Sequence, residues 1–95
     1  MFISIRKYHG IRQIDELNRR VQQEFVPILK EIPGLKGYHT VDCGGGTVVS
    51  ISLFDSREQA LASNDKAREW VQSRLTDLIT DPPEILAGPT GVDVP

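Results

Sequence analysis

Apolar and polar residues alternate along three stretches of the chain, 2–8, 35–42 and 47–54. A period of two residues is typical of a β-strand, because successive side chains point to opposite faces of a sheet. The second and third stretches are separated by three consecutive glycines at positions 44–46. Glycine adopts the positive φ angles of tight turns without steric cost, so the pattern predicts that these two strands form a β-hairpin.

The length of the hairpin loop decides which face of the sheet His39 occupies. A loop of two or four residues pairs His39 with Ser50, whereas a loop of three or five residues pairs it with Ile51. The three-residue loop is favoured, because it gathers aliphatic side chains on one face. That face would carry Leu35, Val41, Val49, Ile51 and Leu53.

A helical pattern lies between the first two strands. Apolar residues at positions 14–32 recur in steps of three and four, which predicts one amphipathic helix from about Asp15. Pro27 has no amide hydrogen, so we expect it to kink this helix or to end a first segment. The pair Pro33-Gly34 ends the helix.

A second helix is predicted after the hairpin. Asp55 or Ser56 caps its start, because each is followed three positions later by a glutamate or glutamine, as in a capping box. The helix is expected to run to about Ile79, ahead of the two prolines at 82–83. Residues 84–87 predict a short edge strand.

The order strand, helix, strand, strand, helix, strand has few compact arrangements. It matches the ferredoxin-like βαββαβ sandwich, an α+β fold whose antiparallel sheet carries both helices on one face. With the aliphatic face of the hairpin against the helices, the other face still carries Phe2, Tyr8, Val48 and Phe54. Such a surface is too apolar to be fully hydrated, so we expect a second copy to cover it in a homodimer.

Composition narrows the class of protein further. With 95 residues, 39% of them hydrophobic, we expect one domain over 1–95, with a tail from about residue 89 that is extended or contacts a partner. The net charge of −2 comes from interspersed charges without a basic stripe, which argues against nucleic acid as a partner. Cys43 is the only cysteine, and no segment resembles a signal peptide or a membrane span, so we expect a cytoplasmic protein without a membrane partner.

One polar residue interrupts the apolar stripe of the second helix. Asn64 lies within about 20° of the centre of that stripe. It either bonds to a carbonyl or phenol oxygen of a ligand beneath the helix, or is satisfied by the backbone or by a strand side chain. Trp70, at the border of the same stripe, either walls such a pocket or shields the helix edge.

Several strand residues are further candidates. His9 and His39 are the only imidazoles; His39 is a candidate base for a phenolic proton if it points into a pocket, and a satisfied or solvent-facing histidine otherwise. Arg6, Tyr8 and Tyr38 are candidates to bind an oxyanion, with the filling of a dimer interface as the alternative. Arg6 stands out, because a buried guanidinium needs a partner.

The chain resembles the dimeric α+β barrel superfamily and, within it, is similar to the antibiotic biosynthesis monooxygenase group. The resemblance covers nearly the whole chain. It rests on Ile32-Pro33-Gly34-Leu35 leading to Gly37-Tyr38, on Val48 to Phe54, and on Leu53-Phe54-Asp55-Ser56 leading into Glu58-Gln59-Ala60. It implies two sheets paired in a barrel and, for several members, oxidation of aromatic or quinone-like substrates between sheet and helices without a bound cofactor.

The sequence departs from the site residues that this resemblance implies. Quinone-forming members carry Asn and Trp four residues apart on the third strand and Tyr early in the second helix, where this chain has Ser50, Phe54 and Ala60. Haem-degrading members use Asn in the first strand and His in the second helix. This chain has no Asn before Asn18 and no His in the second helix, so no haem and no other cofactor is expected.

Two functions remain open from the sequence. The leading one is a cofactor-independent, monooxygenase-like homodimer acting on a small aromatic or polyketide-like compound, with His39 and Asn64 in proton transfer or binding and Arg6, Tyr38 and Trp70 around the ligand. The alternative is a non-catalytic ligand-binding or interaction module of the same fold. A cavity of roughly 300 Å³ or more, with Asn64 and His39 converging on it, would favour the first.

Overall fold

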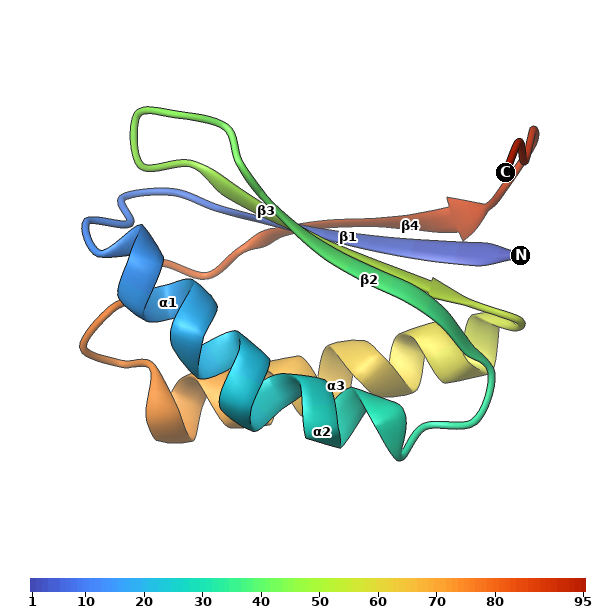
Figure 1. Cartoon of the computed structure of the whole chain (residues 1–95), viewed down its shortest axis with the longest axis horizontal. Coiled ribbons are helices and arrows are strands. Elements are labelled where there is room, and N and C mark those ends of the chain that lie inside the picture. The colour runs from blue at the N-terminus through green and yellow to red at the C-terminus, as the bar shows by residue number, and fades with distance from the viewer.

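The computed structural model describes all 95 residues, which form a layer of helices on one face of a β-sheet (Figure 1). The sheet has the strand order β2-β3-β1-β4, and every neighbouring pair is antiparallel. Its strands are β1 (Phe2–Tyr8), β2 (Leu35–Asp42), β3 (Val48–Phe54) and β4 (Glu84–Pro89). The helices are α1 (Ile14–Arg20), the π-helical η1 (Val21–Phe25), α2 (Val26–Lys30) and α3 (Arg57–Arg74). The predicted ferredoxin-like α+β fold is therefore confirmed, with β1 internal and β4 at an edge.

The hairpin has the predicted three-residue connection. Cys43 donates its backbone N–H to the carbonyl of Thr47 at 2.9 Å, and the three glycines between them all have positive φ. His39 pairs with Ile51, as expected for this loop. Leu35 departs from the predicted face, because a bulge between Leu35 and Gly37 places it opposite Phe54.

The expectation that Val49, Ile51 and Leu53 meet the helices is wrong. The side of β3 that the helices cover carries Val48, Ser50, Ser52 and Phe54, which are all buried. Both faces of the hairpin contain apolar residues, so a period of two shows which side chains share a face but not which face is inside. The same inner side of β1 carries Phe2, Ser4, Arg6 and Tyr8.

The first helical region changes its geometry ahead of Pro27. The amide of Val26 bonds to the carbonyl of Val21, five residues back, in a π-helical turn. Pro27 follows in the first turn of α2, where the lack of an amide hydrogen is tolerated. The predicted break at Pro27 is thus a change from wide π-helical to α-helical winding, and it begins at Val21.

The second predicted helix, α3, starts as expected and ends earlier. Ser56 accepts a bond from the backbone N–H of Gln59, whose side chain in turn accepts one from Ser56 N–H, so the capping box is confirmed. The helix ends at Arg74 and not near Ile79, because its C-terminal residue is followed by a tighter turn in which Leu78 and Ile79 both bond to the Leu75 carbonyl.

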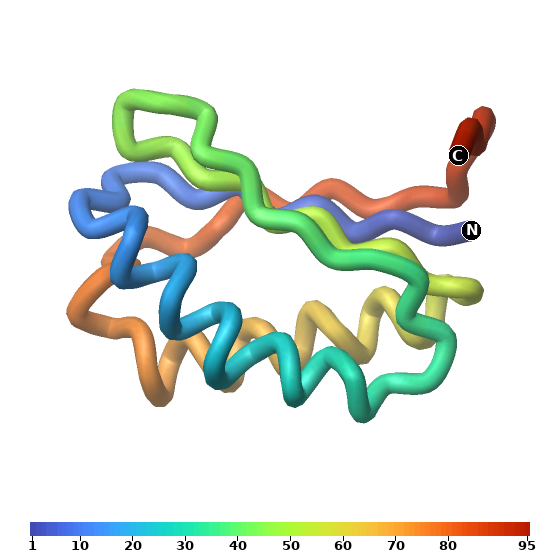
Figure 2. The backbone as a smooth tube through the Cα atoms, viewed as in Figure 1, coloured from blue at the N-terminus to red at the C-terminus, as the bar shows by residue number.

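The main core lies between the helices and the inner side of the sheet. Its fully buried large side chains are Phe25, Leu29, Phe54 and Leu75. The two ends of the chain lie at the same end of the sheet (Figure 2), where the backbone N–H of Thr90 donates to the Met1 carbonyl at 2.8 Å.

The hairpin glycines give a matched stability test. Gly44 and Gly46 share a φ of +83°, but a Cβ at Gly44 would meet nothing, whereas one at Gly46 would lie 3.0 Å from the carbonyl oxygen of Ile11. We expect Gly44→Ala to lower the free energy of unfolding by about 1–2 kcal/mol through the left-handed backbone alone. Gly46→Ala should lose about 1 kcal/mol more through overpacking. Urea unfolding of both variants measures the difference, and equal losses would contradict the contact with Ile11.

Candidate functional site

The side chain of Arg6 lies between the sheet and α3, with only 2% of its surface exposed. Its Nη1 donates to Asn64 Oδ1 at 2.7 Å, and its Nη2 donates to Ser50 Oγ at 3.0 Å. The guanidinium carbon lies 5.7 Å from the centre of the Phe25 ring, within the range of a cation–π contact. A central strand thus places a charged group in the middle of the molecule.

This buried cation has no counter-ion within the chain. None of the six ion pairs in the structure includes Arg6, and its Nε has no hydrogen-bond partner. An arginine stays protonated in proteins, so it cannot avoid the cost of burial by losing its charge. That cost is several kcal/mol for an unpaired ion. A negatively charged or strongly electron-rich oxygen is the kind of group that could compensate this charge.

Asn64 is oriented by Arg6. Its Oδ1 accepts bonds from Ser4 Oγ and from Arg6 Nη1, both at 2.7 Å. Because arginine and the serine hydroxyl both donate here, the carboxamide oxygen must face them and the amino group must point away. The Asn64 amino group makes no hydrogen bond within the chain, and it is available as a donor. The alternative that Asn64 is satisfied by strand side chains therefore holds for its oxygen alone.

Two tyrosines complete the polar cluster. The hydroxyl of Ser50 donates to the hydroxyl of Tyr38 at 2.8 Å, which links Tyr38 to Arg6 through one serine. Tyr8 is buried beside Arg6 on the same strand. Burial raises the pKa of Tyr8, although the Arg6 charge opposes this rise, so the phenol stays protonated in neutral solution and is a hydrogen-bond donor.

Two spaces adjoin this cluster. An inner cavity of about 30 Å³ lies among aromatic and aliphatic side chains, next to Arg6, Tyr8 and Tyr38, and is large enough only for a water-sized group. An outer cleft of about 840 Å³ lies between α3, β1, β4 and the loop after α3, and its lining includes Arg6, Tyr8 and Asn64. The cleft has the volume of a small-molecule site.

The structure brings most of the predicted site residues together, with one exception. Arg6 and Asn64 line the cleft, while Tyr38 and Trp70 line the inner cavity. His39 is exposed on the opposite face of the sheet, opposite Ile51. Within one chain, the expected convergence of Asn64 and His39 is therefore absent, because His39 shares a face with Ile51 and that face, contrary to expectation, points away from the helices.

Trp70 has the packing role considered for it, and it lines the water-sized inner cavity but not the cleft. It is buried, and its ring stacks on Phe25 with 5.2 Å between ring centres. Its indole N–H donates to Glu24 Oε1 at 3.3 Å on the outer side. Trp70 therefore walls the inner cavity while closing the edge of the helix layer.

Sequence reasoning missed the parts played by Phe25 and by the inner serines. Phe25 ends the π-helical turn, contacts the rings of Tyr38 and Trp70 and lies beneath Arg6. The signal available in the sequence was Pro27, which marks irregular winding just after Phe25. The serines had a clearer signal. Ser4, Ser50 and Ser52 fall on the same face as Arg6, on strands whose other residues are mostly apolar.

The cleft contains no histidine, and the chain has no cluster of typical metal ligands. No group of three or more His, Cys, Asp or Glu side chains lies close enough to hold a metal ion. Neither imidazole reaches the cleft, since His39 is on the outer face and His9 lies beside Thr47 at the surface. The cleft therefore offers haem no histidine ligand.

No helix has the length and hydropathy needed to cross a membrane.

The strand order and the single layer of helices are those of the ferredoxin-like fold found in antibiotic biosynthesis monooxygenase-like proteins. No protein-family model matches the sequence, and no curated protein matches it. The likeness is found in solved structures at identities of 11–24%, a level that shows the fold alone.

Three of these structures are informative. A monooxygenase from the ActVA-Orf6 gene of Streptomyces coelicolor, in complex with nanaomycin D, has a TM-score of 0.75 and 18% identity, covering 99% of this chain and 91% of that one. A mutant of MhuD with two manganese protoporphyrin IX molecules per active site also has a TM-score of 0.75, with 16% identity over 100% and 99% of the chains. A putative antibiotic biosynthesis monooxygenase from Nitrosomonas europaea has a TM-score of 0.68 and 13% identity, over 97% and 100%.

The unpaired charge leads to a stability prediction for Arg6→Met. Loss of the guanidinium leaves Asn64 Oδ1 bonded to Ser4 and leaves Ser50 bonded to Tyr38. Methionine fills a similar space without a buried charge, so we expect the free energy of unfolding to stay within about 1 kcal/mol of the original value or to rise.

Urea unfolding measures this, with Arg12→Met at an exposed position as the matched control. A loss of more than about 2 kcal/mol for Arg6→Met alone would mean that Arg6 supports the fold itself.

Proposed function

We propose that the protein binds a small aromatic or polyketide-like compound in the outer cleft and oxidises it as a cofactor-independent, monooxygenase-like enzyme. The observation that carries this proposal is the buried Arg6 guanidinium without a counter-ion, at the wall of a cleft large enough for such a ligand. A phenolate or enolate oxygen is the group that would compensate this charge.

The donors around the cleft suit an oxygen-rich ring system. Arg6 has an unused Nε–H, Asn64 has an unused amino group, and Tyr8 has a protonated hydroxyl. The exposed side chains of Leu61 and Ile85 supply apolar surface for the ring on two sides of the cleft. Adjacent carbonyl and phenolate oxygens, as in hydroxyquinones, would bond to Asn64 and Arg6 together.

The reaction follows from binding the ligand as an anion. A phenolate is electron-rich and can be oxidised by dioxygen directly. One oxygen atom enters the ring as a new carbonyl and the other leaves as water. A phenol and O₂ thus give a quinone and H₂O, with all four electrons supplied by the substrate. Arg6 would hold the charge on the ring oxygen as it develops.

The cleft contains no imidazole to remove a proton, because His39 lies on the outer face. The proposal therefore concerns phenols that are acidic enough to ionise near neutral pH without a histidine base. Two structural neighbours add support, since one was solved with nanaomycin D and is described as a monooxygenase, and another is described as a putative antibiotic biosynthesis monooxygenase.

A second candidate is a non-catalytic binding module with the same ligand site. It is favoured by Phe54 and Ala60, which stand where the resemblance implies catalytic Trp and Tyr and are fully buried in the core. Both candidates require the Arg6 site, and they differ in whether the ligand is oxidised.

Ligand binding tests the part that the two candidates share. We expect 2-hydroxy-1,4-naphthoquinone, whose hydroxyl is ionised at neutral pH, to bind at least tenfold more tightly than 1,4-naphthoquinone, since a charge-assisted hydrogen bond contributes about 1.5–3 kcal/mol. Arg6→Met should remove this preference and Arg12→Met should keep it. Quenching of the single tryptophan, Trp70, reports the affinity. An equal affinity of the original protein for both compounds would contradict the proposal.

Oxygen uptake then separates the two candidates. With a phenol that ionises near neutral pH and is unsubstituted opposite its hydroxyl, the enzyme hypothesis predicts the para-quinone and water, with one O₂ consumed per molecule. Selective binding of the hydroxyquinone without oxygen uptake on a panel of such acidic phenols would favour the binding module.

We also propose that a second copy of the chain covers the outer face of the sheet. The helices leave this outer face uncovered, whereas the sequence suggested that the face with Val48 and Phe54 would be the uncovered one. Its aliphatic side chains are half-buried or exposed: Ile3, Ile5, Val41, Val49, Ile51, Leu53 and Leu86. An apolar surface of this kind is typical of an interface.

Light scattering at micromolar concentration is expected to give about twice the chain mass of 10.6 kDa. Ile51→Lys at the centre of the face should give the mass of one chain, because it would bury an unpaired charge. Leu61→Lys, on α3 and away from that face, is the control that should remain a dimer. A single-chain mass for the original protein would contradict this proposal.

A further inference from the structure

The loop between α3 and β4 forms one wall of the outer cleft. Six of its residues line the cleft: Thr76, Ile79, Thr80, Asp81, Pro82 and Pro83. The first half of the loop is anchored in the core through buried Leu75, Leu78 and Ile79. The width of the cleft beside this loop therefore depends on the contacts that hold its polar residues, which include Thr76, Thr80 and Asp81.

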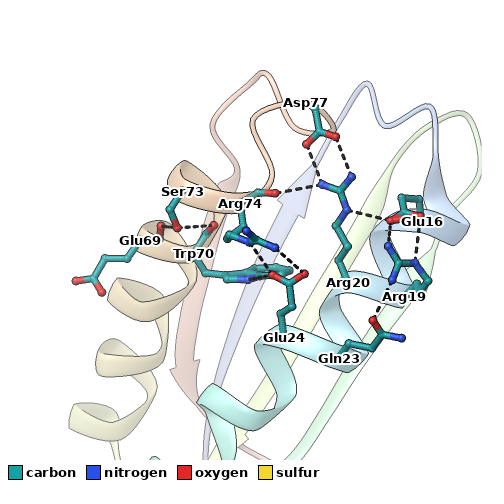
Figure 3. Close-up of polar contacts among 10 residues, drawn as sticks. All are labelled: Glu16, Arg19, Arg20, Gln23, Glu24, Glu69, Trp70, Ser73, Arg74 and Asp77. Atoms are coloured by element: carbon teal, nitrogen blue, oxygen red, sulfur yellow. Dashed lines mark hydrogen bonds and ion pairs between the residues drawn. The ribbon is translucent and has the colours of Figure 1, made fainter.

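Arg20, at the end of α1, reaches across to this loop (Figure 3). Its Nη1 and Nη2 donate to the two carboxylate oxygens of Asp77, each at 2.9 Å. Nη1 also donates to the carbonyl of Arg74 at 3.1 Å, at the last residue of α3. Two parallel hydrogen bonds of this kind fix the orientation of the Asp77 carboxylate as well as its distance from Arg20.

A contact within α1 also holds the Arg20 guanidinium in position. Its Nε donates to Glu16 at 3.0 Å, one helical turn earlier. Its hydrogen bonds are the only ones by which a side chain of another element reaches the loop. Arg20 lowers the pKa of Asp77, so this carboxylate is charged in neutral solution and the pair is intact there.

A second contact ties the same helices together beside the first. Glu24 Oε1 accepts bonds from Arg74 Nε at 2.9 Å and from Trp70 Nε1 at 3.3 Å. This contact ends at α3 and does not reach the loop (Figure 3). Among the polar contacts, Arg20 alone links the first helical region to the wall of the cleft.

We propose that Arg20 is a positioning residue of the cleft: by holding Asp77 and the Arg74 carbonyl, it sets the place of the 76–83 wall and so the time that a ligand stays bound. The inference rests on the proposed ligand site for its effect on binding. The hold of Arg20 on the loop can be measured without any ligand.

The adjacent arginine supplies a matched control. Arg19 bonds to Glu16 and Gln23 on the exposed side of α1 and does not touch the loop. In hydrogen exchange of the ligand-free protein, Arg20→Met should speed exchange of the hydrogen-bonded amides of Leu78 and Ile79 about threefold, since it removes a bidentate ion pair that is partly exposed at Asp77. Arg19→Met should leave these amides unchanged. Arg20→Lys keeps the positive charge but lacks the two parallel N–H donors of the guanidinium, so it should restore only part of the protection of these amides against exchange.

Stopped-flow measurement with 2-hydroxy-1,4-naphthoquinone then tests the effect on the cleft. We expect Arg20→Met to raise the dissociation rate about threefold, with Arg19→Met unchanged. Equal exchange of the loop in the two variants would overturn the proposal. Faster exchange with an unchanged dissociation rate would also overturn it, because the loop would then not set the cleft. If the original protein does not bind the quinone, the proposed ligand site fails, and the exchange result still decides whether Arg20 holds the wall.

Discussion

The buried, unpaired guanidinium of Arg6 is the constraint on which the interior of this protein depends. An apolar interior would exclude such a group, so the sheet and α3 supply small polar partners in the layer around it, Ser50 and Asn64 directly and Ser4 through Asn64. These partners are neutral, and they satisfy the donors at the tip of the guanidinium without cancelling the charge. In the proposed function, the free energy that burying this unpaired ion costs the fold would be recovered when an anion binds.

The Arg6 network explains why the sequence predicted the strands and turns correctly but not the inner face of the sheet. The strand positions, the hairpin register and the cap at Ser56 depend on local chemistry, and each matched the structure. The inward direction of Asn64 followed from helical periodicity alone. The choice of inner face did not, because Val49, Ile51 and Leu53 look more like a core than a strand side with two serines. Hydropathy favours burying the aliphatic face, whereas the Arg6 network requires the serine face to meet α3.

The site also depends on winding that no residue pattern specifies. The π-helical turn at Val21–Phe25 brings Phe25 beneath Arg6 and against Trp70. π-Helical turns are rare and are frequently found at functional sites. Pro27 in the first turn of α2 marks irregular winding nearby, but it does not specify a π-helical turn. The placement of Phe25 therefore had to come from the structure.

The first helical region contacts both the polar cluster around Arg6 and the loop that bounds the cleft. Phe25 lies against the cluster from within, while Arg20 holds the loop that bounds the cleft from outside. Glu24 lies between them in sequence and bonds to Trp70 and Arg74 of α3. A shift of this region along α3 would thus move the floor beneath Arg6 and the wall at Asp77 together. Because the same region carries both contacts, we expect a change in its position to alter the surroundings of Arg6 and the width of the cleft together.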